Sequence, residues 1–425
     1  MKIGFGASEV PIGLGGGRWW RITGGTDIRR RGPRALVGVL LAGLAAWTVL
    51  DIFFAPVGQV EHDRTAQHVL LGCLWVLMAL CAAGARLDLM ICESGLMHAM
   101  AAYALLVGVH GLVRLAGAWD YATLVTLAKH LFWIVAYVAA VRLQQAGALR
   151  ARDLNRAAQV AIVCVSTRLI ASVFDGTVME YEATGWAYCV ARLLPLLLLV
   201  HRPGVVGRVV LVSAVVAVVC TLKRGALVAI VLGQLGFLVA WGHVHPRQRS
   251  RAVALGMLIG LAVAGVLAWR WEAFVGRLAD LQSLETAGSW RGSFYRIILE
   301  QWCRLDTVRQ IVGAGFWAVP DLLERVWVRQ YAHSDWLEIL YDYGLIGVGV
   351  FVWLNLAMLG LVCQAWRRRD ETLPALVMSV MVFWLGTLYS GFTFWPEMVW
   401  FGLLLGYAAG RIEAGQRRWA WRCAT

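Results

Sequence analysis

The chain has 425 residues, of which 60% are hydrophobic and 15% are charged, and its formal net charge is +13. Soluble domains carry about 25% charged residues, so this composition excludes a set of water-soluble domains and predicts a protein embedded in a membrane. The basic residues are nearly all arginines in short runs between apolar segments, which indicates membrane topology and argues against nucleic acid as a partner. The nine cysteines form no CxxC or Cys/His ligand pattern, so no metal and no other cofactor is expected.

Residues 1–34 contain many glycines and arginines but no apolar run, which is unlike a signal peptide and predicts a cytoplasmic N-terminal tail. From residue 35 to 269, apolar segments recur as expected of helices that cross a hydrocarbon layer about 30 Å thick. We predict transmembrane helices 1–9 near residues 35–55, 66–85, 94–116, 121–141, 157–174, 186–200, 205–222, 225–241 and 252–269.

The segment 270–333 is far longer than the other connections, and we predict that it is a periplasmic loop. Phe294, Ile298 and Trp302 recur in it at helical spacing, as in an amphipathic helix that rests on the membrane surface. Transmembrane helices 10–12 follow within residues 334–410, near 334–363, 373–392 and 398–410, and residues 411–425 form a cytoplasmic C-terminal tail. The predicted fold class is all-α, a polytopic membrane protein of about 12 transmembrane helices.

Arginine clusters predict the orientation of these helices. In this scheme the short turns around residues 150–156, 247–251 and 367–369 carry arginines and share one side of the membrane. Because arginine is enriched in cytoplasmic loops, both termini are predicted in the cytoplasm and the long loop in the periplasm of a bacterial inner membrane. The Lys223-Arg224 pair is an exception, since it falls in a tight turn on the periplasmic side.

Four further cations, Arg114, Lys129, Arg168 and Arg192, fall in the outer parts of predicted helices. A charge that faces lipid there costs a few kcal/mol. These side chains either reach the interface, or pair with Asp120, Asp175, Glu180 or Glu182, or bind an anionic ligand in the outer leaflet. A lipid-linked diphosphate is the candidate ligand, because guanidinium groups match phosphate oxygens.

The sharpest motif is His333-Ser334-Asp335-Trp336-Leu337-Glu338, which is followed by Gly344-Leu345-Ile346-Gly347. It resembles the signature of the O-antigen ligase superfamily, which includes O-antigen ligases and Wzy-type polysaccharide polymerases. Three other stretches resemble the same family: Lys223-Arg224-Gly225, Trp290-Arg291-Gly292 and Gly313-Ala314-Gly315. The resemblance extends over residues 221–354.

The resemblance implies a GT-C-like membrane glycosyltransferase that takes glycan from undecaprenyl diphosphate on the periplasmic face, without a metal or cofactor. His333 would be the general base, and Arg224 and Arg291 would stabilise the leaving diphosphate with help from Lys223. Lys129, Arg168 and Arg192 would bind the same diphosphate. Asp335 and Glu338 would contact sugar hydroxyls or orient His333, or they are only favourable charges at a helix start. Arg296 is a candidate glycan contact or a solvated charge.

Within this family we expect a polymerase that joins repeat units, by a displacement that inverts the anomeric centre. Val228 stands where ligases often carry leucine, which favours the polymerase over a ligase that transfers glycan to lipid A core. A flippase or transporter of lipid-linked sugar is the alternative from another class. The expected partners are the undecaprenyl-diphosphate-linked oligosaccharide, a glycan or lipid A core acceptor, membrane lipid and a chain-length regulator.

Overall fold

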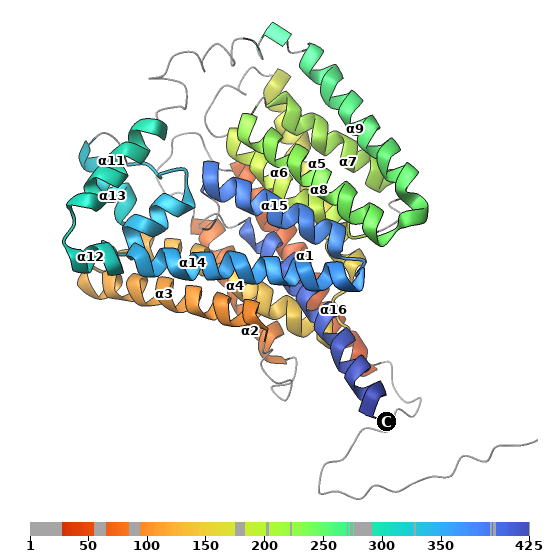
Figure 1. Ribbon diagram of the computed structural model, residues 1–425, viewed down its shortest axis with the longest axis horizontal. Helices are drawn as coiled ribbons and strands as arrows, with labels where there is room; N and C mark the ends of the chain where they lie inside the picture. Colours follow the sequence, from red (N-terminus) through yellow and green to blue (C-terminus); the bar gives the residue numbers. More distant parts are fainter. Residues whose placement is uncertain are drawn as a thin grey trace, which may run out of the picture.

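The computed structural model describes residues 28–54, 65–84, 94–174, 183–200, 204–221, 223–269, 271–272, 275, 291–326, 329–391, 393 and 397–424. Within these ranges the secondary structure is helical and no strand occurs (Figure 1). The predicted all-α class is therefore confirmed.

Every apolar segment predicted as a transmembrane helix corresponds to a helix. Those before the long loop are α1 (Ile28–Phe54), α2 (Thr65–Gly84), α3 (Gly95–Gly117), α4 (Tyr121–Gln145), α5 (Ala151–Phe174), α6 (Ala183–Leu197), α7 (Val205–Cys220), α8 (Arg224–Val244) and α9 (Arg249–Trp269). Those after it are α14 (Asp335–Arg368), α15 (Leu373–Tyr389) and α16 (Met398–Ala424).

The first and last helices are longer than predicted. Helix α1 begins at Ile28, inside the segment predicted as an N-terminal tail, and α16 continues to Ala424, over the predicted C-terminal tail. The apolar pattern ends where charged residues begin, but arginine and glutamate are good helix formers and extend the helices beyond it. Residues 1–27 of the predicted N-terminal tail lie outside the described residues.

Several of the described helices suit a membrane. Gly95–Gly117, Tyr121–Gln145, Gly225–Val244 and Asp335–Arg368 are long and apolar enough to cross one. Shorter apolar helices occur at Arg34–Leu50, Gln67–Cys81, Trp186–Leu197, Val205–Cys220 and Leu373–Tyr389. These helices indicate a membrane-embedded protein, while the predicted number of crossings and their orientation stay predictions.

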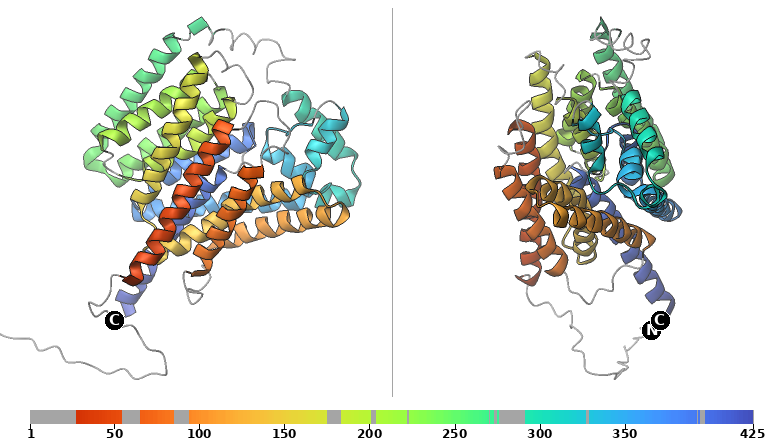
Figure 2. Two further views of the ribbon diagram at one scale, coloured as in Figure 1. Left: turned by 180° about the vertical axis from the view of Figure 1, so that it is seen from behind. Right: turned by 90° about the vertical axis from the view of Figure 1, so that its left-hand side faces the viewer.

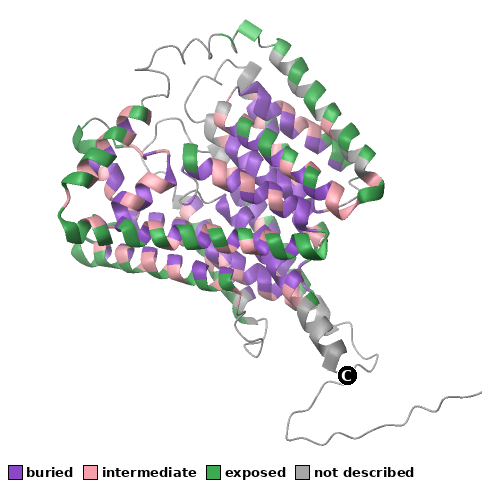
Figure 3. Ribbon diagram, in the orientation of Figure 1, coloured by how far each residue is buried: buried purple, intermediate pink, exposed green. Residues whose placement is uncertain are grey.

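The core lies where α4, α5, α6, α15 and α16 pack together (Figure 3). Helix α6 is its centre, because every side chain from Ala187 to Leu199 is buried. Seen from behind, α1 runs along α5 at the edge of this core (Figure 2, left).

Glycines let α4 and α16 approach each other closely. Gly402, Gly406 and Gly410 repeat every four residues and so share one face of α16. A β-carbon on Gly402 would overlap the carbonyl oxygen of Trp133, and one on Gly406 would overlap that of Tyr137. Small residues commonly mediate such contacts between membrane helices.

The turns that follow α4, α8 and α14 are the arginine clusters of the sequence. Three contacts bring these helix ends together: Gln145 Nε2 donates to Glu413 at 3.0 Å, His243 Nε2 lies 3.0 Å from the Trp366 carbonyl, and Arg411 Nε pairs with Asp370 at 3.1 Å. We call this the arginine-rich end of the bundle. Helices α8, α14 and α16 begin at the opposite end.

The predicted loop contains three helices at the left of Figure 1, α11 (Arg291–Arg304), α12 (Thr307–Val312) and α13 (Ala318–Val326). The amphipathic helix predicted there is α11. Its apolar residues Phe294 and Ile298 are buried against Val319, Leu323 and Tyr341 of α13 and α14. The expectation that this face rests on the membrane surface is therefore wrong, because neighbouring helices of the same chain cover it.

Candidate active site

Gly313 and Gly344, which belong to two of the motif stretches, meet at a kink in α14. Gly344 interrupts the helix with φ 63° and ψ −159°, and Gly313 has φ 94°. Between them, the Ala314 amide donates to the Tyr341 carbonyl at 2.8 Å. A β-carbon at either glycine would overlap main-chain atoms of the other segment, so this contact requires residues without side chains.

Three carboxylates share one face of α14 before the kink. Asp335, Glu338 and Asp342 have exposed fractions of 0%, 7% and 4%. Spacings of three and four residues place them in a row along the helix. The Asp335 carboxylate accepts from the Thr393 hydroxyl at 2.9 Å, and Glu338 accepts from the Ala332 amide at 2.8 Å. Each carboxylate thus holds a different neighbouring loop against α14.

Asp342 holds the third loop. Its carboxylate accepts hydrogen bonds of 3.0 Å from each of the backbone amides of Trp317, Ala318 and Val319. These amides begin α13 and have no partner within that helix, so the carboxylate caps its positive end.

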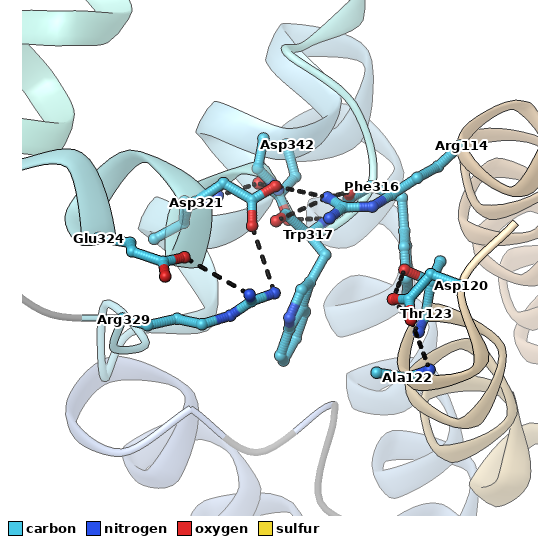
Figure 4. A network of polar contacts seen from close by, with 12 residues as sticks. Arg114, Asp120, Ala122, Thr123, Phe316, Trp317, Asp321, Glu324, Arg329 and Asp342 are labelled. Atoms are coloured by element: carbon cyan, nitrogen blue, oxygen red, sulfur yellow. Dashed lines mark hydrogen bonds and ion pairs between the residues drawn. The ribbon is translucent and has the colours of Figure 1, made fainter. Parts of the chain in front are cut away.

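Arg114 fixes the same loop from α3 (Figure 4). Its Nη1 donates to the carbonyls of Phe316 and Trp317 at 2.8 and 3.0 Å, and it pairs with Asp321 at 2.9 Å. Arg329 pairs with the same Asp321 at 3.3 Å. Arg114 is therefore paired, but its partner among the described residues is Asp321 of the long loop and not one of the acidic residues that the sequence suggested.

His333 lies in the turn before α14 and has a left-handed backbone, with φ 56°. The Tyr295 hydroxyl donates to the backbone carbonyl of His333 at 3.3 Å. Nε2 of the His333 ring lies 3.0 Å from the side-chain amide nitrogen of Gln330. The ring also hydrogen-bonds the backbone of Ser390, just after α15. A non-glycine residue adopts this conformation only where its surroundings impose it, so the position of the imidazole is closely determined.

Arg291 and Lys223 give His333 a positive environment. Burial lowers the pKa of the imidazole, and the charges of Arg291 and then Lys223 lower it further, to about 4. Both effects disfavour the imidazolium form, so the ring is neutral at pH 7. The structure thus brings together three of the residues that the sequence predicted for one site.

The turn that carries Lys223 packs on α6. The Tyr188 hydroxyl occupies the space beside Gly225, where a β-carbon would overlap it. Tyr188 also interacts with Ser390 and Arg291, so α6, α8, α11 and α15 meet around His333. Arg224 begins α8 beside them, and its side chain is outside the described part of the structure.

Arg192 lies deeper, on α6. Its Nη1 pairs with Glu397 at 3.3 Å, and the two side chains are 4% and 5% exposed. Glu397 immediately precedes α16, so the pair connects two distant parts of the chain inside the core. Arg192 has a protein partner here, and its predicted contact with a diphosphate stays a prediction.

Three other predicted ligand contacts lie apart from His333. The Arg168 guanidinium carbon is 5.5 Å from the centre of the Trp186 ring, Lys129 is half-buried in α4, and Arg296 is 79% exposed and pairs with Glu300 at 3.5 Å. Among the described residues, none of these three cations contacts His333.

Three residues of this region were not predicted from the sequence: Asp342, Tyr188 and Glu397. The signal for Asp342 was present, because three carboxylates at positions 335, 338 and 342 of an apolar helix are costly unless each has a partner. The partners of Tyr188 and Glu397 are far away in the sequence, and no local pattern indicated them.

No protein-family model matches this sequence, and no curated protein sequence matches it. The resemblance to the O-antigen ligase superfamily rests on the motif residues alone and stays a prediction.

Proposed function

We propose that this protein is a membrane glycosyltransferase of Wzy polymerase type, which extends one undecaprenyl-diphosphate-linked glycan with another. The observation that carries the proposal is the buried imidazole of His333 beside the cations Arg291 and Lys223, an environment that lowers its pKa. Glycan transfer from a lipid diphosphate needs a base for the incoming hydroxyl and positive charge for the leaving group. This cluster offers both.

In the proposed step, an acceptor hydroxyl oxygen attacks the anomeric carbon of the donor glycan. The bond from that carbon to the diphosphate oxygen breaks, and its electron pair leaves with the diphosphate. Arg291 and Lys223, together with Arg224, offset the growing negative charge, while His333 takes the hydroxyl proton. A single displacement of this kind inverts the anomeric centre.

A pKa of about 4 makes the His333 imidazole a weak base in the free protein. Donor binding changes this, because the diphosphate brings negative charge to the two cations that suppress protonation. The pKa of His333 then rises towards its ordinary value, and its basicity increases only when the donor is in place. His333 therefore stays unprotonated in the free protein and becomes a stronger base for the acceptor hydroxyl once the donor is bound.

Asp335 and Glu338 are proposed to position His333. Both are buried, and their oxygens bond Thr393 and Ala332. Ala332 directly precedes His333, so Glu338 restrains the turn that carries the base. Of the three alternatives that the sequence left open for these carboxylates, orientation of His333 is therefore the one proposed.

The direct test is to incubate the purified protein with a defined lipid-diphosphate-linked repeat and to measure glycan dimers. His333→Gln should lower kcat by about 100-fold or more with little change in donor affinity. Arg291→Gln and Lys223→Gln should weaken both donor binding and turnover. Arg304→Gln is the matched control, because it removes an exposed charge from the same helix as Arg291. Full activity in His333→Gln would refute the proposed base.

A gene deletion separates the polymerase from the ligase. Loss of a polymerase leaves single repeats attached to their acceptor, whereas loss of a ligase leaves long chains on undecaprenyl diphosphate. Normal chain length together with normal attachment would exclude both. Transport of lipid-linked sugar by purified vesicles, without any new glycosidic bond, would establish the flippase instead.

A further inference from the structure

A separate cavity of about 530 Å³ lies between α1 and α5. Its body is lined by apolar side chains of both helices, including Val37, Leu41, Ala157 and Val160. Val160 is also 56% exposed, so the cavity opens on the outer, apolar surface of the bundle. The shape is that of a groove along two helices.

Positive charge collects at one end of this groove. Arg34, Arg150 and Arg156 line it, and the latter two lie at the start of α5, at the arginine-rich end. Helix α1 runs in the same direction as α5. Thr48, near the C-terminal end of α1, accepts from Trp400 at the start of α16, which lies opposite the arginine-rich end. Arg34 therefore lies at the arginine-rich end as well.

Among the described residues, the groove lining holds three arginines but one carboxylate. Asp153 also lines the groove, and it accepts from the backbone amide of Arg150 at 3.2 Å, which caps the start of α5. Within the described residues, none of the three guanidinium groups forms an ion pair. An anion at this position would gain three cationic partners against one carboxylate.

We propose that the groove binds an anionic phospholipid, with its phosphate among Arg34, Arg150 and Arg156 and an acyl chain along the apolar body. A soluble phosphate would leave the apolar body open, whereas a lipid fills both parts. Basic pockets between membrane helices bind anionic headgroups. The volume of this groove is in the range of small-molecule sites. The groove is remote from His333, so this site is independent of the proposed reaction.

The test uses the purified full chain in detergent, with thermal unfolding and native mass spectrometry as readouts. Phosphatidylglycerol should raise the Tm by about 5 °C and remain bound, while phosphatidylcholine should do neither. The double variant R150Q/R156Q should bind phosphatidylglycerol about 30-fold more weakly. Gly38→Leu should also weaken binding, because a β-carbon on Gly38 meets no atom within 4 Å and its side chain would enter the groove.

Arg152→Gln is the matched control, because Arg152 lies in the same turn of α5 and is exposed but does not line the groove. It should retain the full response to phosphatidylglycerol. Equal binding of the two lipids by the wild type, or equal losses in R150Q/R156Q and Arg152→Gln, would overturn the proposal. Glycerol phosphate alone should give no Tm shift, and the same shift as the intact lipid would show a phosphate site and overturn the lipid assignment.

Discussion

Gly313 and Gly344 lie back to back: the amide nitrogen of Gly313 is only 2.6 Å from the position of a β-carbon added to Gly344. This contact joins the end of α12 to the kink in α14. It also sets the direction of the helical segment that carries the three buried carboxylates.

Gly344→Ala should therefore destabilise the protein by at least about 2 kcal/mol, because alanine combines an unfavourable positive φ with overlap against the Ile311 main chain. Thermal unfolding in detergent measures the change. Gly349→Ala is the control, since a β-carbon there meets nothing within 4 Å and alanine favours a helix. Equal stability of the two variants would contradict the packing argument.

Asp342→Asn should lower the free energy of unfolding by about 2 kcal/mol, because three amides at the start of α13 donate to the two carboxyl oxygens and asparagine replaces one of those acceptors with an NH2 donor. Hydrogen exchange of the Trp317, Ala318 and Val319 amides should rise with it. Asp306→Asn provides a comparison, since Asp306 caps the exposed helix α12. A loss confined to Asp306→Asn would show that Asp342 is dispensable.

The Arg192 and Glu397 pair calls for a double-mutant cycle. Arg192→Met alone should cost about 3–5 kcal/mol of stability, since it removes the arginine that pairs with the buried carboxylate of Glu397. R192M/E397Q should cost less than the sum of the single changes. Additive losses would show that the two charges do not interact. A double variant that folds but has lost donor binding would instead support the predicted diphosphate contact of Arg192.

The pH dependence of the reaction should differ between free and donor-bound protein. The free-protein pKa of about 4 predicts that kcat/KM persists down to about pH 4 and falls below it as His333 becomes protonated. The acid limb of kcat should lie at higher pH, because bound diphosphate raises the pKa of His333. Coincident limbs would contradict this coupling.

The same pKa predicts the sign of a stability change. The imidazole binds a proton less readily in the folded chain than in the unfolded chain, whose ordinary value is 6.5. The unfolded state therefore binds more protons between pH 6.5 and 4, and the contribution of His333 to stability is lost as the pH falls through that window. Between pH 6.5 and 4, thermal unfolding should therefore show a smaller loss of stability in His333→Gln than in the wild type.

Gln330 offers a way to change the base without touching it. A carboxylate in place of the Gln330 amide, 3.0 Å from Nε2, favours the imidazolium form. Gln330→Glu should move the acid limb of kcat/KM up by about one pH unit, whereas the uncharged variant Gln330→Met should not. An unchanged limb in Gln330→Glu would mean that His333 does not govern it.

Most of the helical architecture was predictable because apolar segments end at charged turns. The glycine motif was predictable in its positions, although only the structure shows that Gly313 and Gly344 touch. The packing partner of the apolar face of α11 was not predictable, because periodicity shows that a face is apolar but does not identify what covers it. Arg192 and Glu397 are 205 positions apart, and a single sequence carries no information on such a pairing.

The bonds from Thr393 to Asp335 and from Glu397 to Arg192 also impose an order on biosynthesis. Thr393, which donates to Asp335, and Glu397, which accepts from Arg192, both lie in the last tenth of the chain, after the segment that carries His333. A nascent polypeptide still attached to the ribosome can insert its earlier helices, but it cannot complete this arrangement. A product truncated before Thr393 will therefore lack both contacts, however well its first helices are integrated.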